Sequence, residues 1–593
     1  MVAGFFWSTK LYKLNEAKEN TGFDIYGKSA EAVLKNWYSK DKFWEVIMKI
    51  EKRKIVLNQL GYLLDKEKRA ISTEASPFSV VDQNTNSIVF SGEAFGPIFD
   101  QASSEQVYVL DFSDIQEEGD YYIKQSESKS LSFPISEKPY ESLQNGVLKA
   151  FYFLRCGMEL KEEYAGVWKH KACHTSKGKV LNEPHLELDC SGGWHDAGDY
   201  GKYTVAAAKA LADLLLAYQT YPQSFLNTIS IPESDGIIPD ILHEARYELE
   251  WLLKMQDLRD GGVFHKVTTL AFPGLDVMPE DDEHDLYLCP VSSTATASFV
   301  AVLALASTVY RTIDEAFSIR CLEAARKSWS WLESNPEMVL FKNPQEVSTG
   351  EYGDSSDLDE RYWAAAQMYH ATKEEVYHHA FKELFLKDFK KCELGWTNVS
   401  GYGTLSYLTL NIAEVDDTIQ NELRREWVGL ANALLQQKKT NGYPTSLREN
   451  DFIWGSNMVL LNHAMTLLYA FHFSGKESFE QGALVQLDYL LGCNPLGYSY
   501  VTGFGANSIQ NPHYRPGVGD GIEAPIPGMI AGGPNKGLQD EYAKQVLDGY
   551  PPSKCFVDHQ DSYSTNEITI YWNSPAIFVL AHFNALDINK NDI

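Results

Sequence analysis

The chain has 593 residues, of which 44% are hydrophobic and 22% charged, so it can bury a large core in more than one domain. Its formal net charge of −29 would repel nucleic acid and anionic lipid, and no long basic run offsets this charge. We therefore expect neither nucleic acid nor a membrane as a partner. The sequence also indicates no apolar run long enough to cross a bilayer. The sequence does not predict an oligomeric state.

The first part of the chain carries little information. Residues 1–52 form an N-terminal extension without a recognisable motif, although residues 35–52 could form an amphipathic helix. The first ten residues, MVAGFFWSTK, lack the length and charge order of a secretory signal. The eight cysteines of the chain are sparse and do not have the spacing of a disulfide scaffold.

Residues 53–137 are predicted to form a small β-sandwich. Short β-rich runs alternate there with turn residues, and evenly spaced short strands are typical of such a sandwich. The predicted strands are residues 54–57, 78–81, 88–90, 107–110 and 121–123. We expect this domain to have a packing role rather than to bind sugar, because its aromatic residues are not grouped as a strip.

Residues 138–593 are predicted to be mainly helical, with about a dozen segments of helical periodicity. The clearest are residues 140–155, 204–218, 239–255, 292–309, 316–332, 359–369 and 457–473. No alternation of strands and helices is seen, which argues against a Rossmann or TIM-barrel sheet. Periodicity alone leaves a helical bundle, a solenoid and a toroid open. Residues 491–536 are rich in glycine, proline and asparagine and are expected to form a long functional loop.

Two segments combine carboxylates with aromatic residues. Residues 191–203 read SGGWHDAGDYGKY, and residues 561–568 read DSYSTNEI. Hydrolysis of a glycosidic bond needs one carboxyl group to protonate the leaving oxygen and another to activate water, and aromatic rings offer flat faces on which sugars stack. Each segment also has a simpler interpretation. Asp199 could cap the helix predicted to follow it, and Ser564 and Glu567 have the spacing of a capping box.

Both segments resemble the active-site signatures of glycoside hydrolase family nine, the inverting cellulases. The resemblance implies that Asp199 is the general base, that Asp196 helps to hold the water, and that Glu567 is the general acid. Residues 56–62, VLNQLGY, resemble the opening of the immunoglobulin-like module that precedes many catalytic domains of this family. The expected fold is therefore mainly α: an (α/α)6-barrel catalytic domain, preceded by a small immunoglobulin-like β-sandwich.

Cys156, Cys173, His174 and His195 are a candidate metal set, because thiolate and imidazole ligands suit tetrahedral zinc. Their spacing is not that of a zinc finger, and a buried free cysteine with ordinary histidines would explain them as well. The segments FLRCG and WKHKACH around the two cysteines resemble the zinc-ligand segments of the subfamily with the N-terminal module. The resemblance implies one structural zinc ion, which would brace the loop of Asp196 and leave no position open for water.

The loop segment NPHYRP contains His513 and Arg515 and resembles the histidine–arginine substrate motif of the family. These two side chains would donate hydrogen bonds to sugar hydroxyls or support the carboxylates, although an exposed polar loop is the simpler interpretation. The nearby segment YVTGFG, residues 500–505, agrees with the family as well. Trp454 and Tyr563 are predicted platforms for sugar rings, with burial in the core as an equal alternative.

Residues 349–360, TGEYGDSSDLDE, form an oxygen-rich turn that leads into a predicted helix. Such clusters can bind calcium, although similar acidic loops usually just face solvent. Family members often carry structural calcium here. The resemblance therefore implies a calcium site led by Thr349, Glu351 and Asp354.

The resemblance implies an inverting glycoside hydrolase that cleaves β-1,4-glucosidic bonds, in the first place an endo-β-1,4-glucanase (cellulase). An exo-acting β-glycosidase on cello-oligosaccharides or glucosamine oligomers is one alternative, and a non-catalytic sugar-binding protein is another. The family is mostly extracellular, while the lack of a visible signal peptide leaves a cytoplasmic location open. Inversion requires the carboxyl groups of Asp199 and Glu567 to lie roughly 6.5–9.5 Å apart, and Glu567 needs a raised pKa to stay protonated.

Overall fold

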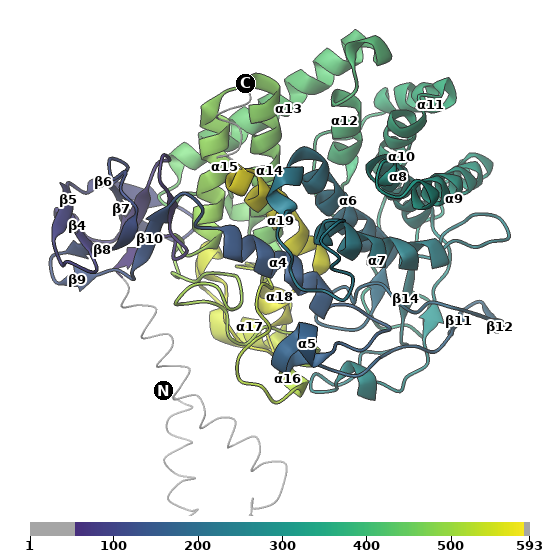
Figure 1. Ribbon diagram of the computed structural model, residues 1–593, viewed down its shortest axis with the longest axis horizontal. Coiled ribbons are helices and arrows are strands. Elements are labelled where there is room, and N and C mark those ends of the chain that lie inside the picture. Colours follow the sequence, from purple (N-terminus) through teal and green to yellow (C-terminus); the bar gives the residue numbers. More distant parts are fainter. Residues whose placement is uncertain (1–53, 586–593) are drawn as a thin grey trace, which may run out of the picture. The chain divides into compact units, whose positions relative to one another are not determined.

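The computed structural model describes residues 54–585 of the chain. The predicted N-terminal extension, with its possible amphipathic helix, lies outside the described residues. Along the described part, the strands β1 to β10 come first and the long helices follow from α4 on (Figure 1).

Two sheets form the β-sandwich that the sequence predicts. One has the order β1-β3-β7-β6 and the other β2-β10-β8-β4-β5, with β9 paired to β8. The strands are β1 (Ile55–Val56), β2 (Tyr62–Leu63), β3 (Arg69–Ser72), β4 (Phe78–Asp82), β5 (Ile88–Gly92), β6 (Phe95–Asp100), β7 (Glu105–Asp111), β8 (Gly119–Gln125), β9 (Ser128–Lys129) and β10 (Phe133–Ser136). Buried side chains such as Val80, Leu110 and Phe133 fill the space between the sheets. The five predicted strands are confirmed, whereas β2, β3, β6, β9 and β10 have no counterpart in the prediction.

Twelve helices of nine or more residues follow within residues 54–585, and they pack as two nested rings of six. The inner ring consists of α6 (Thr204–Thr220), α8 (Ser293–Tyr310), α10 (Leu358–Thr372), α12 (Ser400–Leu408), α14 (Ser456–Ser474) and α19 (Ile570–Ala585). The outer ring consists of α4 (Glu141–Phe153), α7 (Asp240–Lys254), α9 (Glu315–Ser334), α11 (Glu375–Phe385), α13 (Asp417–Thr440) and α15 (Glu477–Leu490). The last helix, α19, packs against α4, α6 and α14 (Figure 1). This is the expected (α/α)6 barrel, and all seven helices predicted by position are confirmed.

The side chains explain which helices lie inside. The inner helices α8 and α19 are buried on nearly all sides, whereas the outer helix α7 has one buried and one partly buried face, and the outer helix α9 has one buried and one exposed face. By length and composition alone, α8 could cross a membrane, which corrects the expectation that no run of this length exists. Of its residues, 89% are buried in the fold, where the helix packs against α6, α9 and α10. It therefore has the surroundings of a core helix.

The β-sandwich is joined to the barrel through the segment VLNQLGY and the turn after it. Asn58 donates from Nδ2 to Asp488 Oδ1 at 2.8 Å and to the Tyr140 hydroxyl at 3.0 Å, and all three residues are buried. Lys66 forms an ion pair with Glu480 of α15 at 2.7 Å. These contacts agree with the packing role expected for the sandwich.

A five-stranded sheet that the sequence does not predict lies within the helical part, in the order β12-β11-β15-β14-β13. Its strands are β11 (Gly178–Val180), β12 (Glu183–Leu188), β13 (Lys202–Tyr203), β14 (Lys266–Thr268) and β15 (Tyr287–Leu288). Most are too short to show the alternation by which strands are recognised. Strand β13 ends the segment SGGWHDAGDYGKY and leads directly into α6, so the sheet fixes one end of the predicted base loop.

The segments that precede the inner helices contact one another. The ring of Tyr352, before α10, contacts the rings of Tyr203 before α6, Trp396 before α12 and Tyr571 at the start of α19. The predicted carboxylates stand in two of these segments, before α6 and before α19. The fold therefore gathers them at one end of the barrel.

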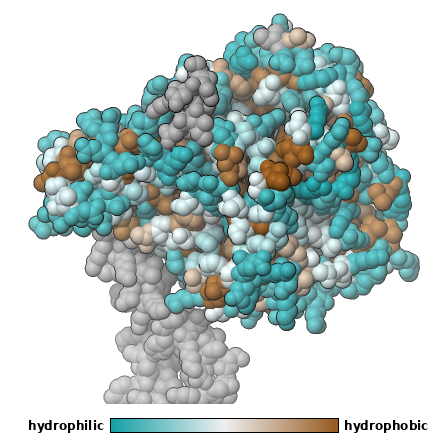
Figure 2. Space-filling view, viewed as in Figure 1, coloured by the Kyte–Doolittle hydropathy of each residue, from teal (hydrophilic) through white to brown (hydrophobic). Residues whose placement is uncertain are grey.

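Four shorter helices complete the described part: α5 (Glu162–Ala165), α16 (Arg515–Gly519), α17 (Glu541–Leu547) and α18 (Tyr563–Asn566). Hydrophilic side chains predominate on the face of the molecule seen in Figure 2, and apolar ones occur there in small separated groups. All eight cysteines are buried and free, in agreement with the absence of a disulfide scaffold from the sequence pattern.

Candidate active site

Asp196 is fully buried where the segments before the inner helices meet. Its backbone N–H donates to the Gly201 carbonyl, and its own carbonyl accepts from the N–H of Ile570 in α19. The Tyr352 hydroxyl donates to Oδ2 at 2.5 Å, whereas Oδ1 has no hydrogen-bond partner within residues 54–585. Burial raises the pKa of Asp196 well above its usual range, and the nearby Asp199 carboxylate adds to this, although the bond from Tyr352 opposes it.

Asp199 lies in the same loop and is 7% exposed. Its Oδ2 accepts from the N–H of Gly201 at 2.9 Å. Between the two aspartates, Gly198 has no room for a side chain, because a Cβ there would lie 2.3 Å from the His513 carbonyl oxygen and 3.2 Å from Glu567 Oε1. This close packing places the loop of the aspartates directly against Glu567.

The structure excludes the helix-cap interpretations of the two segments. Tyr203 is the N-cap of α6, and no side chain caps this helix, so Asp199 is not a cap. Ser564 lies inside α18, and Glu567 is the residue that ends α18, so the two do not form a capping box. Both carboxylates are therefore left for another role.

Glu567 connects α18 to α19 with an extended backbone. It pairs with His513 in a parallel bridge. Burial raises the pKa of Glu567 well above its usual range, and the charges of Asp199 and Asp196 raise it further, while Arg515 lowers it. A raised pKa favours the protonated form of the carboxyl group, which is the form that a general acid needs.

His513 and Arg515 contact the backbone around the carboxylates. The buried Arg515 donates from Nη1 to the Gly198 carbonyl at 2.7 Å and from Nε to the Pro273 carbonyl at 3.2 Å. Nδ1 of His513 lies 2.6 Å from the Gln560 carbonyl, so this nitrogen carries the proton and Nε2 is an acceptor. Burial lowers the pKa of His513, in keeping with a neutral ring. Of the two predicted roles, Arg515 has the contacts of the supporting one, and a contact of either residue with sugar stays a prediction.

Tyr352 is the residue of this site that the sequence analysis does not identify. Its ring stacks on that of Tyr203, with 4.2 Å between the centroids, and lies 4.9 Å from that of Trp396. Its φ of +52° is rare for a bulky side chain. Tyr352 lies inside the predicted calcium loop. The one sequence feature that could have identified it is an aromatic residue among acidic residues, which is also the feature of the two carboxylate segments.

Trp454 and Tyr563 form a pair of aromatic rings beside the carboxylates. Their centroids lie 5.3 Å apart, and the Tyr563 ring lies 5.9 Å from that of His513. Trp454 is 39% exposed, so it is not a core residue, and Tyr563 is partly exposed. The pair is therefore accessible to a ligand, and its contact with sugar stays a prediction.

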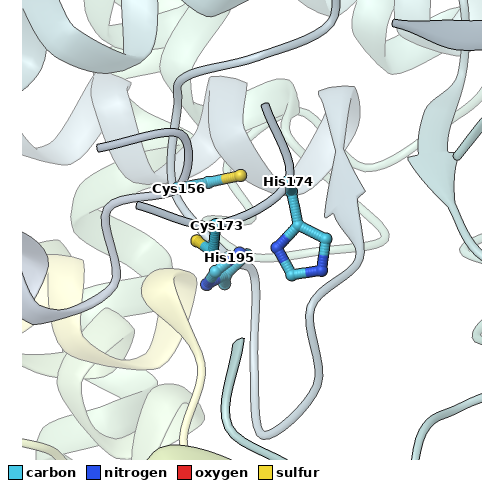
Figure 3. A group of neighbouring side chains, drawn as sticks. All are labelled: Cys156, Cys173, His174 and His195. Carbon is cyan, nitrogen blue, oxygen red and sulfur yellow. The ribbon is translucent and has the colours of Figure 1, made fainter. Parts of the chain in front are cut away.

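Four predicted metal ligands come together from three segments of the chain, as Figure 3 shows for Cys156, Cys173, His174 and His195. One ligand atom from each lies within 4.8 Å of the others. His174 Nδ1 and His195 Nε2 are buried and have no hydrogen-bond partner among the described residues. The second ring nitrogen of His174, Nε2, lies 3.3 Å from Asp282 Oδ2. Metal-binding histidines usually form such a hydrogen bond to a carboxylate through the nitrogen that does not bind the metal. These four side chains, named here the Cys156 cluster, fit a metal ion with thiolate and imidazole ligands.

The three residues predicted to bind calcium are engaged by donors from the protein. Thr349 Oγ1 lies 3.2 Å from the ammonium of Lys266. Glu351 Oε2 accepts from the backbone N–H of Asn343 at 3.0 Å, and Asp354 Oδ1 accepts from the backbone N–H that follows it at 2.5 Å. Within residues 54–585, the Cys156 cluster is the one group of three or more histidine, cysteine or acidic side chains with metal-binding spacing.

Buried and partly buried carboxylates at one end of a helical barrel, beside accessible aromatic rings, form the arrangement of a glycoside hydrolase. The sequence profile of glycosyl hydrolase family 9 matches residues 140–580, and the profile of the cellulase N-terminal ig-like domain matches residues 51–130. The chain belongs to glycosyl hydrolase family 9. It is therefore an enzyme, and the alternative of a non-catalytic sugar-binding protein is set aside.

Similar proteins cover nearly the same length. A cellodextrinase from Butyrivibrio fibrisolvens is 42% identical over 551 residues, which are 89% of this chain and 99% of the relative. The structure of a single mutant of a thermostable endoglucanase from Alicyclobacillus acidocaldarius is 41% identical, with a TM-score of 0.86 over 90% of this chain and 99% of that chain. The structure of a Zn-binding triple mutant of the family 9 endoglucanase J30 is 31% identical, with a TM-score of 0.84 over 88% and 99% of the two chains.

Proposed function

We propose that this protein cleaves β-1,4-glucosidic bonds in a single displacement, with Asp199 as general base and Glu567 as general acid. Asp199 takes a proton from water, the water oxygen bonds to the anomeric carbon, and the bond to the leaving oxygen breaks as Glu567 protonates it. The observation that carries the proposal is the setting of Glu567. Its side chain is partly buried next to Asp196 and Asp199, where its pKa is raised.

Asp196 is proposed to hold the attacking water. Tyr352 already donates to Oδ2, and Oδ1 is buried without a partner among the described residues. A water next to Asp199 can donate one hydrogen bond to Asp196 Oδ1 and give its other proton to the base. This division of roles makes Asp196 a positioning carboxylate and Asp199 the proton acceptor.

The stereochemistry of the first product tests the mechanism. A β-linked substrate should release α-configured sugar first, which proton NMR detects before mutarotation mixes the anomers. The carboxyl groups of Asp199 and Glu567 are expected to lie in the inverting range of roughly 6.5–9.5 Å. Initial release of the β-anomer would overturn the single displacement.

For the substrate we propose a soluble or cellulosic β-1,4-glucan cut internally, since the similar structure from Alicyclobacillus acidocaldarius is named an endoglucanase. The relative named cellodextrinase supports a second candidate, an enzyme that acts on short cello-oligosaccharides. The two differ in their products. Internal cleavage lowers the viscosity of carboxymethylcellulose after few cuts. Action at chain ends leaves the viscosity nearly unchanged and releases products of one size from cellohexaose. Chitosan oligomers test the glucosamine alternative.

We propose zinc as the ion of the Cys156 cluster, because two thiolates and two imidazoles are a common structural zinc set. Cys156, Cys173, His174 and His195 would hold it, and the zinc-binding variant of the similar J30 enzyme supports this choice of ion. When bound, the ion ties three chain segments together and has no free coordination position for water. His195 directly precedes Asp196, so the cluster would secure the loop that carries the base.

For calcium we propose ligands further along the loop than the sequence pattern indicates. Glu360 Oε2 is buried without a partner among the described residues, and burial together with Asp359 and Asp354 raises the pKa of Glu360. A divalent cation would relieve this crowding of carboxylates. Calcium titration calorimetry tests the proposal. Loss of calcium binding in Glu360→Gln supports it. If Glu360→Gln still binds calcium and Glu351→Gln does not, the ligands are those predicted from the sequence.

A further inference from the structure

Lys266, at the start of β14, is a lysine whose side chain is completely buried. Its Nζ lies 2.5 Å from the Gly350 carbonyl, 2.8 Å from Asn343 Oδ1 and 3.2 Å from Thr349 Oγ1. An ammonium group has three protons and no acceptor, so these three oxygens use all of its donors. Two of them belong to the loop that leads to Tyr352.

His265, the residue before Lys266, holds the same loop two residues further on. Its Nε2 lies 3.0 Å from the Tyr352 carbonyl oxygen and its Nδ1 lies 2.8 Å from Ser292 Oγ. Because a carbonyl can only accept, Nε2 carries the proton and Nδ1 accepts from the serine. The imidazole stacks on the Phe341 ring with 4.0 Å between the centroids, which fixes its plane.

These contacts hold the backbone of Tyr352 in a conformation that is rare for a bulky residue. Tyr352 has a φ of +52°, a region that bulky residues rarely occupy unless their surroundings enforce it. Lys266 holds the carbonyl of Gly350, and His265 holds that of Tyr352 itself. In this conformation the Tyr352 hydroxyl reaches Asp196 Oδ2 at 2.5 Å.

The same strand is also paired with the chain that leads out of the aspartate loop. Lys266 is the pairing partner of Tyr203 in β13, and the N–H of Thr204 donates to the His265 carbonyl at 3.0 Å. The Tyr203 ring stacks on that of Tyr352. Through their backbone, β14 and the residue before it thus fix the segment after Asp199. Through the side chains of Lys266 and His265, they fix the loop of Tyr352.

We propose that Lys266 and His265 are positioning residues, which hold the loop of Tyr352 in register with the loop of Asp196 and Asp199 so that the tyrosine hydroxyl orients the Asp196 carboxylate. This inference rests on the proposed function, in which Asp196 holds the attacking water. It assigns a role in the reaction to the first residue of β14 and to the residue before it, neither of which touches the water or the bond that breaks.

A double-mutant cycle on cellohexaose tests the proposal. Lys266→Met should lower kcat by roughly 10- to 100-fold with KM changed less than about threefold, because misplacement of a catalytic group by about 1 Å costs about that much. Tyr352→Phe should lower kcat to a similar extent. If Lys266 acts through Tyr352, the double variant loses no more than the worse single variant. Losses that multiply, or an unchanged kcat in Lys266→Met, would overturn the proposal.

Two further variants separate positioning from a general loss of stability. Lys68→Met is the matched control, since Lys68 is also buried and bonds the carbonyls of Leu64 and Lys66, but in the β-sandwich. It should lower Tm and leave kcat of the folded enzyme unchanged. If Lys266→Met does not fold, Asn343→Ala removes one of its three acceptors, and its smaller loss in kcat should likewise vanish in the Tyr352→Phe background. A loss that persists there contradicts the proposal.

Failure of the positioning role can be told from failure of the proposed function. If Tyr352→Phe and Asp196→Asn both leave kcat unchanged, Asp196 does not hold the water and the proposed mechanism is wrong. If both lower kcat and the loss in Lys266→Met multiplies with that in Tyr352→Phe, the mechanism stands and only the inference on β14 falls.

Discussion

The two sides of the proposed active site are held in different ways. On the base side, Asp196 and Asp199 share one loop, which is fixed by the Tyr352 hydroxyl, the Gly201 N–H and the strand β13. On the acid side, Glu567 is located by backbone pairing, and its surroundings act mainly on its proton, through burial and two neighbouring negative charges. A base must be placed relative to a water, whereas an acid must keep a proton. The base side is therefore determined mainly by the positions of its hydrogen-bond partners, and the acid side mainly by the burial and charges that raise the pKa of Glu567.

The largest effects should come from removing either carboxyl group. Asp199→Ala and Glu567→Ala should each lower kcat on cellohexaose by roughly 10³-fold or more, since general acid and base catalysis each contribute about 10²–10⁴-fold. A dinitrophenyl cellobioside has a leaving group that departs without protonation. On this substrate Glu567→Ala should recover most of its activity and Asp199→Ala should not.

Circular dichroism and Tm serve as folding controls for these variants, with Glu567→Gln as the version of nearly equal volume. If Asp199→Ala recovers on the activated substrate as well, or if Glu567→Ala does not, the roles of base and acid are assigned to the wrong residues.

Removing the proposed zinc ion should weaken the base side in particular. Metal analysis should give about one zinc per chain, and Cys173→Ser or chelation should lower Tm by roughly 5 °C or more, because binding energy at a structural zinc site is folding energy. The activity should fall through kcat, as the loop after His195 loses its support. Cys321→Ser, a buried cysteine of α9 outside the Cys156 cluster, is the control. A protein without zinc that is indifferent to chelator would refute the site.

Tyr352→Phe should have an intermediate effect. It removes the hydrogen bond to the Asp196 carboxylate, which is worth about 1.5–3 kcal/mol when one partner is charged, so kcat should fall by roughly 10- to 100-fold. KM should change little, because the tyrosine acts on a carboxylate. Tyr122→Phe in the β-sandwich is a control with the same atom removed. A rise in KM at constant kcat would instead make Tyr352 a residue that binds substrate.

The smallest effect concerns the pH dependence of stability on the acid side. Because the folded state raises the pKa of Glu567, its stabilising contribution is complete below the unfolded value of about 4.3 and is lost as the pH rises through the raised value. Glu567→Gln stays neutral, so it should gain stability over the wild type from about pH 4 to about pH 8. The gain is about 1.4 kcal/mol per unit of pKa difference. Denaturant unfolding at both pH values measures it, and a constant difference would show that Glu567 is not buried as a neutral acid.

Local patterns explain what the sequence predicts well. Inner helices such as α8 and α14 are recognisable because their apolar side chains continue over many turns, although the inner helices α12 and α19 are not among those predicted by position. The two carboxylate segments are recognisable because each carries several reactive side chains within a few residues, whereas the ligands of the Cys156 cluster are spread over residues 156–195. For the cluster, the resemblance of the segments around its cysteines to those of glycoside hydrolase family nine implies the role.

Tyr352, His265 and Lys266 depend instead on contacts between distant segments. Tyr352 lies 156 residues from the carboxylate that it contacts. The strand of Lys266 has only three residues, too few for a pattern, and its partner Tyr203 is in a strand of two. The calcium site of Thr349, Glu351 and Asp354 stays a prediction, and an oxygen-rich loop does not reveal that a lysine from another segment will bond to Thr349.

The order of Asp199, Glu567 and α19 along the chain has a consequence for protein synthesis. Glu567 directly precedes this helix, and it follows Asp199 by 368 residues (567 minus 199). At roughly 5–20 residues per second, a ribosome needs about 20–75 s to extend the chain from the base to the acid. During that interval the inner ring lacks the helix that packs against α4, α6 and α14. A nascent chain that has not yet reached Glu567 lacks the proposed acid and one helix of the inner ring, so it is expected to be inactive on glucan.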